Sequence, residues 1–150
     1  MPRDRVAAIL IQDDAVALIE RRRGQDLYYL FPGGRVEGTE TLQDALAREI
    51  IEELGLHVEA ARLVAEVSYR GSVQHYFTSR VVGGTFGTGR GAEILGPTPP
   101  EDGTYRPLWV PTSAMSGMPI YPSCVVELIM ASREGGWPMT PRTFVDPGRR

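Results

Sequence analysis

The sequence predicts a single α/β domain whose mixed β-sheet lies between helices. The chain has 150 residues, of which 42% are hydrophobic and 23% are charged, and this is the size and composition of one ordinary globular domain. Short runs with β-branched residues alternate with two segments of helical period. Because strands interleaved with helices build layered α/β domains, we expect one domain over residues 1–150 with a sheet covered on both faces.

The first two strands are expected at residues 6–11 and 16–20, on either side of the turn-like stretch QDD. Their lengths and β-branched content favour a hairpin. The second strand leads into the stretch RRRGQDLYYLFPGG, which ends in a glycine-rich turn.

The first helix is expected in the stretch TETLQDALAREIIEEL, which has the period of an amphipathic helix. Thr41 is a suitable N-cap, and Asp44 follows three residues later in a capping-box arrangement. Gly55 then ends the helix, at the position after a helix where glycine is common.

The rest of the chain is expected to supply three more strands and a second helix. The strands are placed at residues 57–69, 73–86 and 105–110. A loop at residues 87–104, rich in glycine and proline, is too long to be only a hairpin turn, and loops of that length are often functional. The second helix opens at Ser123, directly after a proline.

The C-terminal tail, residues 135–150, is rich in proline and shows no periodicity. We expect it to be an extended arm or partly disordered. Its Trp137 and Phe144 make it a candidate segment for crossing to the second subunit of a homodimer.

The charge balance excludes one broad class of partner. A net charge of −3 argues against an electrostatic grip on extended DNA or RNA, which needs clustered lysine and arginine. The first apolar run ends at Ile11 without a cleavage site, so we interpret it as a strand of a cytoplasmic protein and expect no membrane association. Cys124 is the single cysteine, so the chain forms no internal disulfide, and it is expected to be an ordinary buried apolar residue.

The first helix carries an acidic stripe beside its apolar stripe. Glu49, Glu52 and Glu53 fall within an arc of roughly 100° when successive residues are turned by about 100°. Such a stripe is ordinarily a solvated face, but here Arg48 can hold the carboxylates in place and the stretch FPGG precedes the helix. Because Mg²⁺ and Mn²⁺ prefer carboxylate and carbonyl oxygens, the cluster indicates a divalent-cation site.

The same residues form a longer motif. From Gly34 the chain matches every specified position of the Nudix box, G-x5-E-x7-R-E-U-x-E-E-x-G-U, with Ile50 and Leu56 at the aliphatic U positions. The positions matched by identity are Gly34, Glu40, Arg48, Glu49, Glu52, Glu53 and Gly55. The chain therefore resembles the Nudix hydrolases of the MutT-like kind.

This resemblance implies an α/β/α sandwich and a pyrophosphohydrolase that needs Mg²⁺ or Mn²⁺. In such enzymes a metal-activated water attacks a phosphorus of a nucleoside diphosphate derivative in line with the leaving group. The implied metal ligands are the Gly33 carbonyl, Glu49, Glu52 and Glu53. Glu49 is alternatively the general base, and Arg48 and Glu40 orient it, so that Glu49, Arg48 and Glu52 are the expected catalytic residues. The resemblance gives Gly34, Glu40 and Gly55 a structural role at the site.

Residues outside the box extend the expected site. The family often adds an acidic loop residue, for which Glu93 and Glu101 are candidates; Glu93 is preferred because its neighbouring glycines let the backbone fold back toward the helix. Arg22, in the stretch ERRR, is a candidate phosphate ligand, although single arginines are ordinarily solvated. Aromatic side chains near it could stack on a base, although aromatics alternating on a strand ordinarily serve the core. The candidate substrate-binding residues are Arg22, Tyr28, Tyr29 and Phe77.

The two histidines, His57 and His75, have no cysteine or histidine neighbours at zinc spacing. We interpret both as packing or surface residues, with His75 a weaker candidate for contact with the substrate.

Three functions remain open on the sequence. The first is a Nudix hydrolase acting on a nucleoside triphosphate or another nucleoside diphosphate derivative. The second is a catalytically silent nucleotide-sensing or protein-binding module, which usually has substitutions in the REUxEE segment. The third is an enzyme of the same fold with another reaction, such as RNA cap cleavage or isopentenyl diphosphate isomerisation. The absence of a proline between Pro32 and Pro97 disfavours ADP-ribose as the substrate, and the base is left open.

Overall fold

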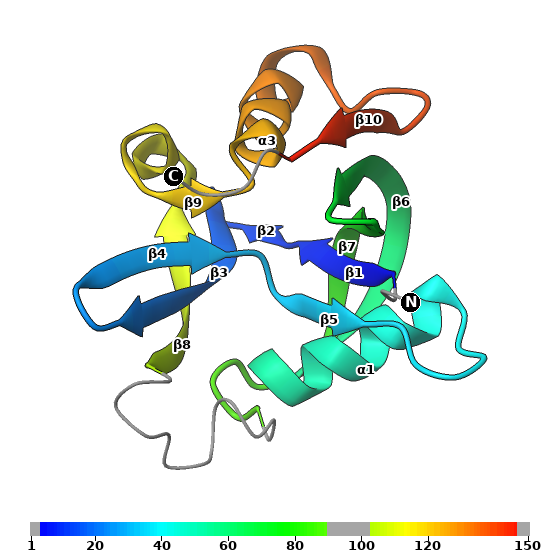
Figure 1. Cartoon of the computed structure of the whole chain (residues 1–150), viewed down its shortest axis with the longest axis horizontal. Coiled ribbons are helices and arrows are strands. Elements are labelled where there is room, and N and C mark those ends of the chain that lie inside the picture. Colours follow the sequence, from blue (N-terminus) through cyan, green and yellow to red (C-terminus); the bar gives the residue numbers. More distant parts are fainter. Residues whose placement is uncertain (1–3, 90–102, 147–150) are drawn as a thin grey trace.

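In the part of the chain that the structure describes, the strands form two β-sheets that lie between two α-helices (Figure 1). The structure is a computed structural model that describes residues 4–89 and 103–146. This arrangement confirms the expected α/β class, with the difference that the strands divide between two sheets and do not form one.

The first sheet contains strands from both ends of the chain. Its members are β1 (Arg5–Ile9), β5 (Gly33–Arg35), β6 (Leu56–Tyr69), β7 (Ser72–Gly84) and β10 (Arg142–Val145). Their order across the sheet is β10-β6-β7-β1-β5. Strands β6 and β7 form a long antiparallel hairpin, β1 runs parallel to β7, and β5 runs antiparallel to β1.

The second sheet is built around β3. Its members are β2 (Ile11–Gln12), β3 (Ala15–Arg23), β4 (Asp26–Leu30), β8 (Thr104–Pro111) and β9 (Ile120–Tyr121). β3 pairs antiparallel with β2, β4 and β8, and β9 runs parallel to β4. A 3-10 helix, η2 (Thr112–Gly117), lies between β8 and β9 in the chain.

Helix α1 (Leu42–Leu54) begins and ends as the sequence predicts. The Thr41 hydroxyl accepts a hydrogen bond from the Asp44 amide at 3.0 Å, which satisfies one of the free N–H groups at the helix start. Gly55 follows the helix with φ of 77°, a left-handed conformation that glycine adopts at little cost.

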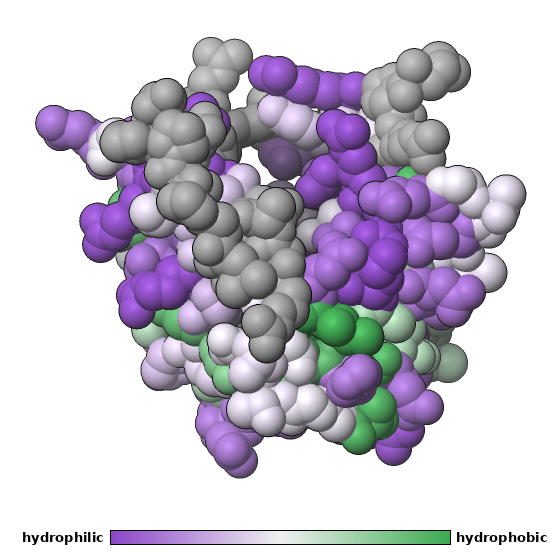
Figure 2. Space-filling model, turned by 90° about the horizontal axis from the view of Figure 1, so that it is seen from below, coloured by the Kyte–Doolittle hydropathy of each residue, from purple (hydrophilic) through white to green (hydrophobic). Residues whose placement is uncertain are grey.

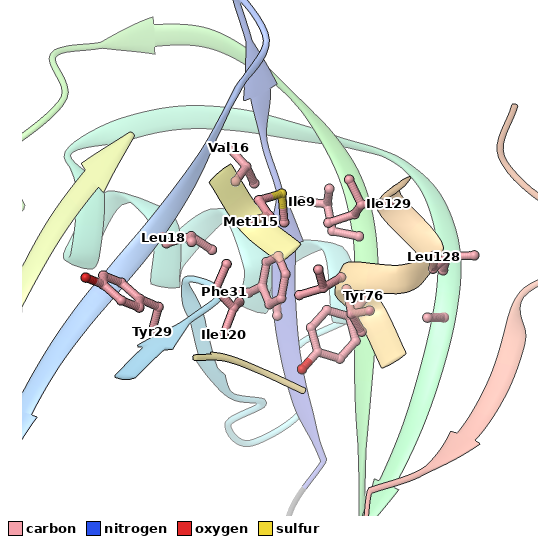
Figure 3. Packing of buried hydrophobic residues seen from close by; sticks show 14 of the residues in the cluster. Ile9, Val16, Leu18, Tyr29, Phe31, Tyr76, Met115, Ile120, Leu128 and Ile129 are labelled. Atoms are coloured by element: carbon pink, nitrogen blue, oxygen red, sulfur yellow. The ribbon is translucent and has the colours of Figure 1, made fainter. Parts of the chain in front are cut away.

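The second predicted helix is α3 (Ser123–Gly135). Together the two helices cover two separate hydrophobic cores. One cluster includes residues of α3, among them Ile129, together with Leu18 of β3 (Figure 3). The other includes Leu46 and Ile50 of α1 together with Ile19 of β3. Successive residues of β3 therefore point to opposite cores, as the two-residue period of a strand requires.

The expected hairpin between the first two strands is shorter than predicted. Ile11 of β2 lies opposite Val16 of β3, and the intervening Asp13 and Asp14 both have positive φ, as a type I′ turn requires. The preceding strand β1 pairs in the other sheet. Residues Val6–Leu10 are all buried, and a continuous buried apolar run is typical of a strand covered on both faces.

The C-terminal tail contains a strand that the sequence did not reveal. Residues of β10 pair in parallel with β6, with Phe144 opposite Val67. Trp137 and Phe144 are partly buried and pack against the core beneath α3 of their own chain. Part of their aromatic surface is thus used within the chain, and the possible homodimer stays a prediction.

In the described part of the chain, no helix is both long enough and apolar enough to cross a membrane.

Candidate functional site

Strand β5 brings the backbone of the FPGG turn against the acidic stripe of α1. Gly33 lies opposite Ala7 and Gly34 opposite Val6 in the pairing with β1. A Cβ atom at Gly33 would collide with the carbonyl oxygen of Val6, and one at Gly34 would collide with the carboxylate of Glu49. Both positions therefore need glycine because neighbouring atoms lie too close to leave room for a Cβ, and not because φ is positive.

Glu53 connects the helix to this strand. Its side chain is buried, and its Oε1 accepts a hydrogen bond from the Gly33 amide at 2.6 Å. A charged acceptor with a backbone N–H donor makes a short, strong hydrogen bond. The contact fixes the distance between the acidic face of α1 and the glycine backbone of β5.

Arg48 is the centre of the polar network around the helix. Its guanidinium donates to both carboxylate oxygens of Glu40, at 2.7 and 2.9 Å, and to Glu49 Oε1 at 2.9 Å. It also donates to the carbonyl oxygen of Arg35 at 2.9 Å, and it lies 3.5 Å from Glu52 Oε1. The expected role of Arg48 and Glu40 in orienting Glu49 has a direct geometric counterpart in these bonds.

This network shifts the pKa values of both partners. The hydrogen bond from Arg48, followed by one from the Glu37 amide, lowers the pKa of Glu40 to about 2. The same bond to Glu40 raises the pKa of Arg48 above its usual range. Both groups are therefore charged at neutral pH, which is the state that the ion pair needs.

The three carboxylates of the stripe do not have equal positions. Glu49 and Glu53 both line a cleft beside β5, while the Glu52 side chain is 44% exposed and its carboxylate lies beside Arg48. In the described part of the chain, no three His, Cys, Asp or Glu side chains converge as a ready-made metal site. The carboxylates repel one another, and two of them are held by hydrogen-bond donors instead. Arg48 donates to Glu49, and the Gly33 amide donates to Glu53.

The donor set nevertheless fits a hard divalent cation. Carboxylate oxygens of Glu49 and Glu53 stand at the cleft next to the backbone of Gly33, and oxygen ligands of this kind are those that Mg²⁺ and Mn²⁺ prefer. The missing side chain at Gly34 keeps open the space that the Glu49 carboxylate occupies. Glu93 and Glu101, the expected loop carboxylates, lie outside the described residues.

The cleft has a volume of about 530 Å³ and is lined by residues of both sheets. Its wall is partly cationic, with guanidinium-bearing side chains at Arg5, Arg21 and Arg35. Viewed from below, the molecule is mostly hydrophilic around a hollow, with hydrophobic surface confined to a smaller patch (Figure 2). The same cleft is also lined by four acidic residues, Glu37, Glu49, Glu53 and Asp146, so its wall carries charges of both signs.

Arg21, and not Arg22, is the arginine of β3 that faces the cleft. Arg21 is buried, with its guanidinium 3.7 Å from the centre of the Tyr105 ring, a cation–π geometry. Arg22 points to the other face of the strand, where it is 60% exposed and lies 3.7 Å from Glu20. The two-residue period of the strand separates the two neighbours.

The aromatic residues expected to bind substrate lie in the core instead of the cleft. Tyr28 packs edge-on against Tyr121, Tyr29 donates a hydrogen bond to Glu20, and Phe77 packs in the cluster beneath α1. All three are less than a tenth exposed, and none of them lines the described cleft. The aromatic side chains that do line it are Phe31, Tyr69, Tyr76, Tyr105 and Tyr121.

The histidines lie away from the cleft. His75 is buried with its ring nitrogens 3.0 Å from Asp4 and from Glu66, and His57 is exposed. Cys124 packs half-buried against the core beneath α3, and burial raises the pKa of its thiol.

Sequence reasoning missed the even-numbered face of β7. It named His75 and Phe77 of this strand as candidates for contact with the substrate, but Gln74 and Tyr76 point to the opposite face and line the cleft. A polar residue two positions from a tyrosine was the available signal. It was not decisive, because both faces of this strand are covered.

Comparisons with known proteins agree with this geometry. The family model described as NUDIX domain matches residues 1–121. The chain is 39% identical over 92 residues to the 8-oxo-dGDP phosphatase NUDT18 of Homo sapiens, a match that covers 59% of this chain and 28% of that protein. It is 38% identical over 80 residues to an RNA pyrophosphohydrolase of Pseudomonas fluorescens, covering 53% and 48% of the two chains.

Solved structures show the same fold at low identity. An ADP-ribose pyrophosphatase of Streptococcus suis superposes with a TM-score of 0.64 at 21% identity, over 97% of this chain and 100% of that one. A NUDIX hydrolase of Nitrosomonas europaea superposes with a TM-score of 0.68 at 22% identity, over 95% and 78%. The sequence matches span only 28% and 48% of the two curated relatives.

Proposed function

Because the chain belongs to the NUDIX domain family, we propose that it is a hydrolase that cleaves a phosphoanhydride bond in a nucleoside triphosphate or another nucleoside diphosphate derivative. The observation that carries this proposal is the Arg48 network, which holds Glu49 at a cleft lined by arginine side chains. A silent module usually has substitutions in the REUxEE segment, and this chain has none. Each carboxylate required by the box is present, and Glu49 and Glu53 meet at the cleft.

A divalent cation, Mg²⁺ or Mn²⁺, would be held by Glu52 and Glu53 together with the Gly33 backbone, which leaves Glu49 to act as the general base. When bound, it would polarise phosphoryl oxygens and lower the pKa of a coordinated water. Glu52 would have to turn from Arg48 toward the cleft, which its exposed side chain can do without breaking core packing.

The chain's own residues would then position the substrate and deprotonate the attacking water. Arg5, Arg21 and Arg35 would bind the phosphate oxygens and balance charge that develops on the leaving group. Glu49 would take the proton of the attacking water as the general base, with its carboxylate oriented by Arg48. The proposal places the enzyme in the cytoplasm, where the single Cys124 stays reduced.

The test is a phosphate-release panel with Mg²⁺ or Mn²⁺. It compares canonical and oxidised nucleoside triphosphates, dinucleoside polyphosphates, nucleotide sugars and ADP-ribose. The variant is Glu52→Gln, and the matched control is Glu59→Gln, an exposed glutamate of β6 paired with Arg80. We expect one substrate class to be hydrolysed, with at least a roughly 100-fold loss of kcat in Glu52→Gln and none in Glu59→Gln. Binding of nucleotides without turnover of any of them would instead support the silent sensing or protein-binding module.

A further inference from the structure

A glutamine and a tyrosine of β7 are linked in the wall of the cleft. The Tyr76 hydroxyl donates a hydrogen bond to Gln74 Oε1 at 2.8 Å. Tyr76 is 3% exposed, and burial, followed by its neighbours Cys124 and Asp146, raises the pKa of its phenol. The hydroxyl therefore keeps its proton at physiological pH and acts as a permanent donor to the amide oxygen.

This bond determines what Gln74 offers to a ligand. A glutamine amide has one acceptor oxygen and one NH₂ donor group. Tyr76 donates to this oxygen, and among the described residues the NH₂ group has no hydrogen-bond partner. If the amide turned over, the Tyr76 oxygen could accept from the NH₂ group, but the hydroxyl proton would lose its acceptor, which is unfavourable away from water. Gln74 thus lines the cleft as a donor of fixed orientation.

The pairing of the strands places Gln74 beside Arg5 and two strands away from β5. Arg35 of β5, Arg5 of β1 and Gln74 of β7 lie side by side in one row across three adjacent strands. Neighbouring strands are about 4.8 Å apart, so the backbone of Gln74 lies about 10 Å from that of β5. Tyr69 of β6 is its diagonal neighbour on the same face, and its ring also lines the cleft.

This spacing suits the base of a bound nucleotide. With its terminal phosphates near β5 and Arg35, a nucleotide would extend along the row past Arg5 and bring its base toward Tyr69 and Gln74. Bases differ in the groups that they present at their edges. Guanine presents O6 and N7 as acceptors and thymine presents O4, whereas adenine and cytosine present an amino donor at the equivalent position.

We propose that Gln74, oriented by Tyr76, reads the base and selects nucleotides with an oxo group over those with an amino group at that edge. The inference rests on the proposed function for the identity of the ligand class, and it assigns a specificity residue that neither the motif nor the relatives indicate.

The test measures binding, separately from hydrolysis. Dissociation constants are determined by calorimetry for two matched pairs of monophosphates, IMP with AMP and UMP with CMP, in which an oxo group replaces an amino group. We expect the wild-type protein to bind the oxo member of each pair about tenfold more tightly, the factor that one good base contact supplies.

Two variants distinguish recognition of the base by Gln74 from a role in packing. Gln74→Glu keeps an acceptor for Tyr76 and replaces the donor with an acceptor oxygen, so we expect the oxo preference to disappear or reverse. Tyr76→Phe keeps the ring and frees the amide to turn over, so we expect the oxo-to-amino ratio to fall toward one while the thermal stability stays high enough for binding at 25 °C. Gln25→Glu, an exposed change in the β3–β4 turn, is the control.

The outcomes distinguish this inference from the proposed function. Equal affinities within each pair in the wild type, or a preference unchanged in both Gln74→Glu and Tyr76→Phe, would overturn the role of Gln74 even if nucleotides are hydrolysed. A preference that disappears in both variants supports it, even if the phosphate-release panel shows no turnover. Failure to bind any of the four monophosphates overturns the inference as well.

Discussion

Among single residues, Arg48 has the largest influence on the geometry of the candidate site. One guanidinium holds Glu40, Glu49 and the Arg35 carbonyl at hydrogen-bond distance. Only a planar group with several fixed donors can make these bonds at once, so lysine is no substitute. The network joins the helix to the strand that precedes it in the chain.

The ion pair between Arg48 and Glu40 should make the stability of the folded protein depend on pH. The pKa of Glu40 is about 2 in the folded protein, against an ordinary value of 4.5. A lowered carboxyl pKa stabilises the folded state above the unfolded pKa, and this stabilisation is lost as the pH falls from 4.5 through 2. We therefore expect Glu40→Gln to be less stable than the wild type at pH 7, with the difference closing between pH 4.5 and 2.

Urea unfolding at a series of pH values measures this difference. Glu134→Gln, an exposed change on α3, serves as the control. The same stability gap between wild type and Glu40→Gln at pH 7 and at pH 2.5 would contradict the assignment.

At the scale of elements, the short strand β5 depends on two glycines for different reasons. At Gly33 an added Cβ would meet the backbone of β1, whereas at Gly34 it would meet the end of the Glu49 side chain. Backbone in a paired strand cannot move aside, but a side-chain terminus can. Substitution of Gly33 should therefore affect mainly stability, and substitution of Gly34 mainly activity.

We expect Gly33→Ala to lower the free energy of unfolding by about 3 kcal/mol, as overpacking does. Gly34→Ala should lower it by less than about 1 kcal/mol while reducing kcat by roughly 100-fold, because Glu49 leaves its place beside Arg48. Gly135→Ala, where the added atom meets open space, is the control for both measurements. Loss of stability in Gly34→Ala with normal turnover would show that Glu49 is not positioned by this space.

The whole molecule brings the acidic face of α1 and the arginines of three strands to one cleft. Strands β1 and β5 belong to one sheet and β3 to the other, so the cationic wall exists only when both sheets are in place. A cation held by the glutamates of α1 and the Gly33 backbone of β5 should also stabilise the fold, because these elements meet only in the folded chain.

This stabilisation is measurable without a substrate. Mg²⁺ at ten times its Kd should raise the free energy of unfolding by about 1.4 kcal/mol, since it binds the folded state alone. We expect no such increase in Glu53→Gln and the full increase in Glu59→Gln, with thermal unfolding as the readout. Equal stabilisation of both variants would place the cation elsewhere.

Local sequence was sufficient to predict the helix that carries the motif. The Thr41 cap, the Gly55 terminus and the Arg48–Glu49 contact all depend on residues a few positions apart, which is why they could be predicted. The neighbouring strands β6 and β7 were also predictable, because their turn and their β-branched content are local signals.

The long-range pairings had to come from the folded chain. Strands β1, β3 and β7 have buried residues on both faces, so alternation alone does not tell which face meets the cleft. For this reason the odd-numbered Arg21 took the place expected for Arg22, and the even-numbered Gln74 lines the cleft where Phe77 was expected. Which face becomes a binding surface depends on the partner strand that each residue meets, and those partners lie many positions away in the chain.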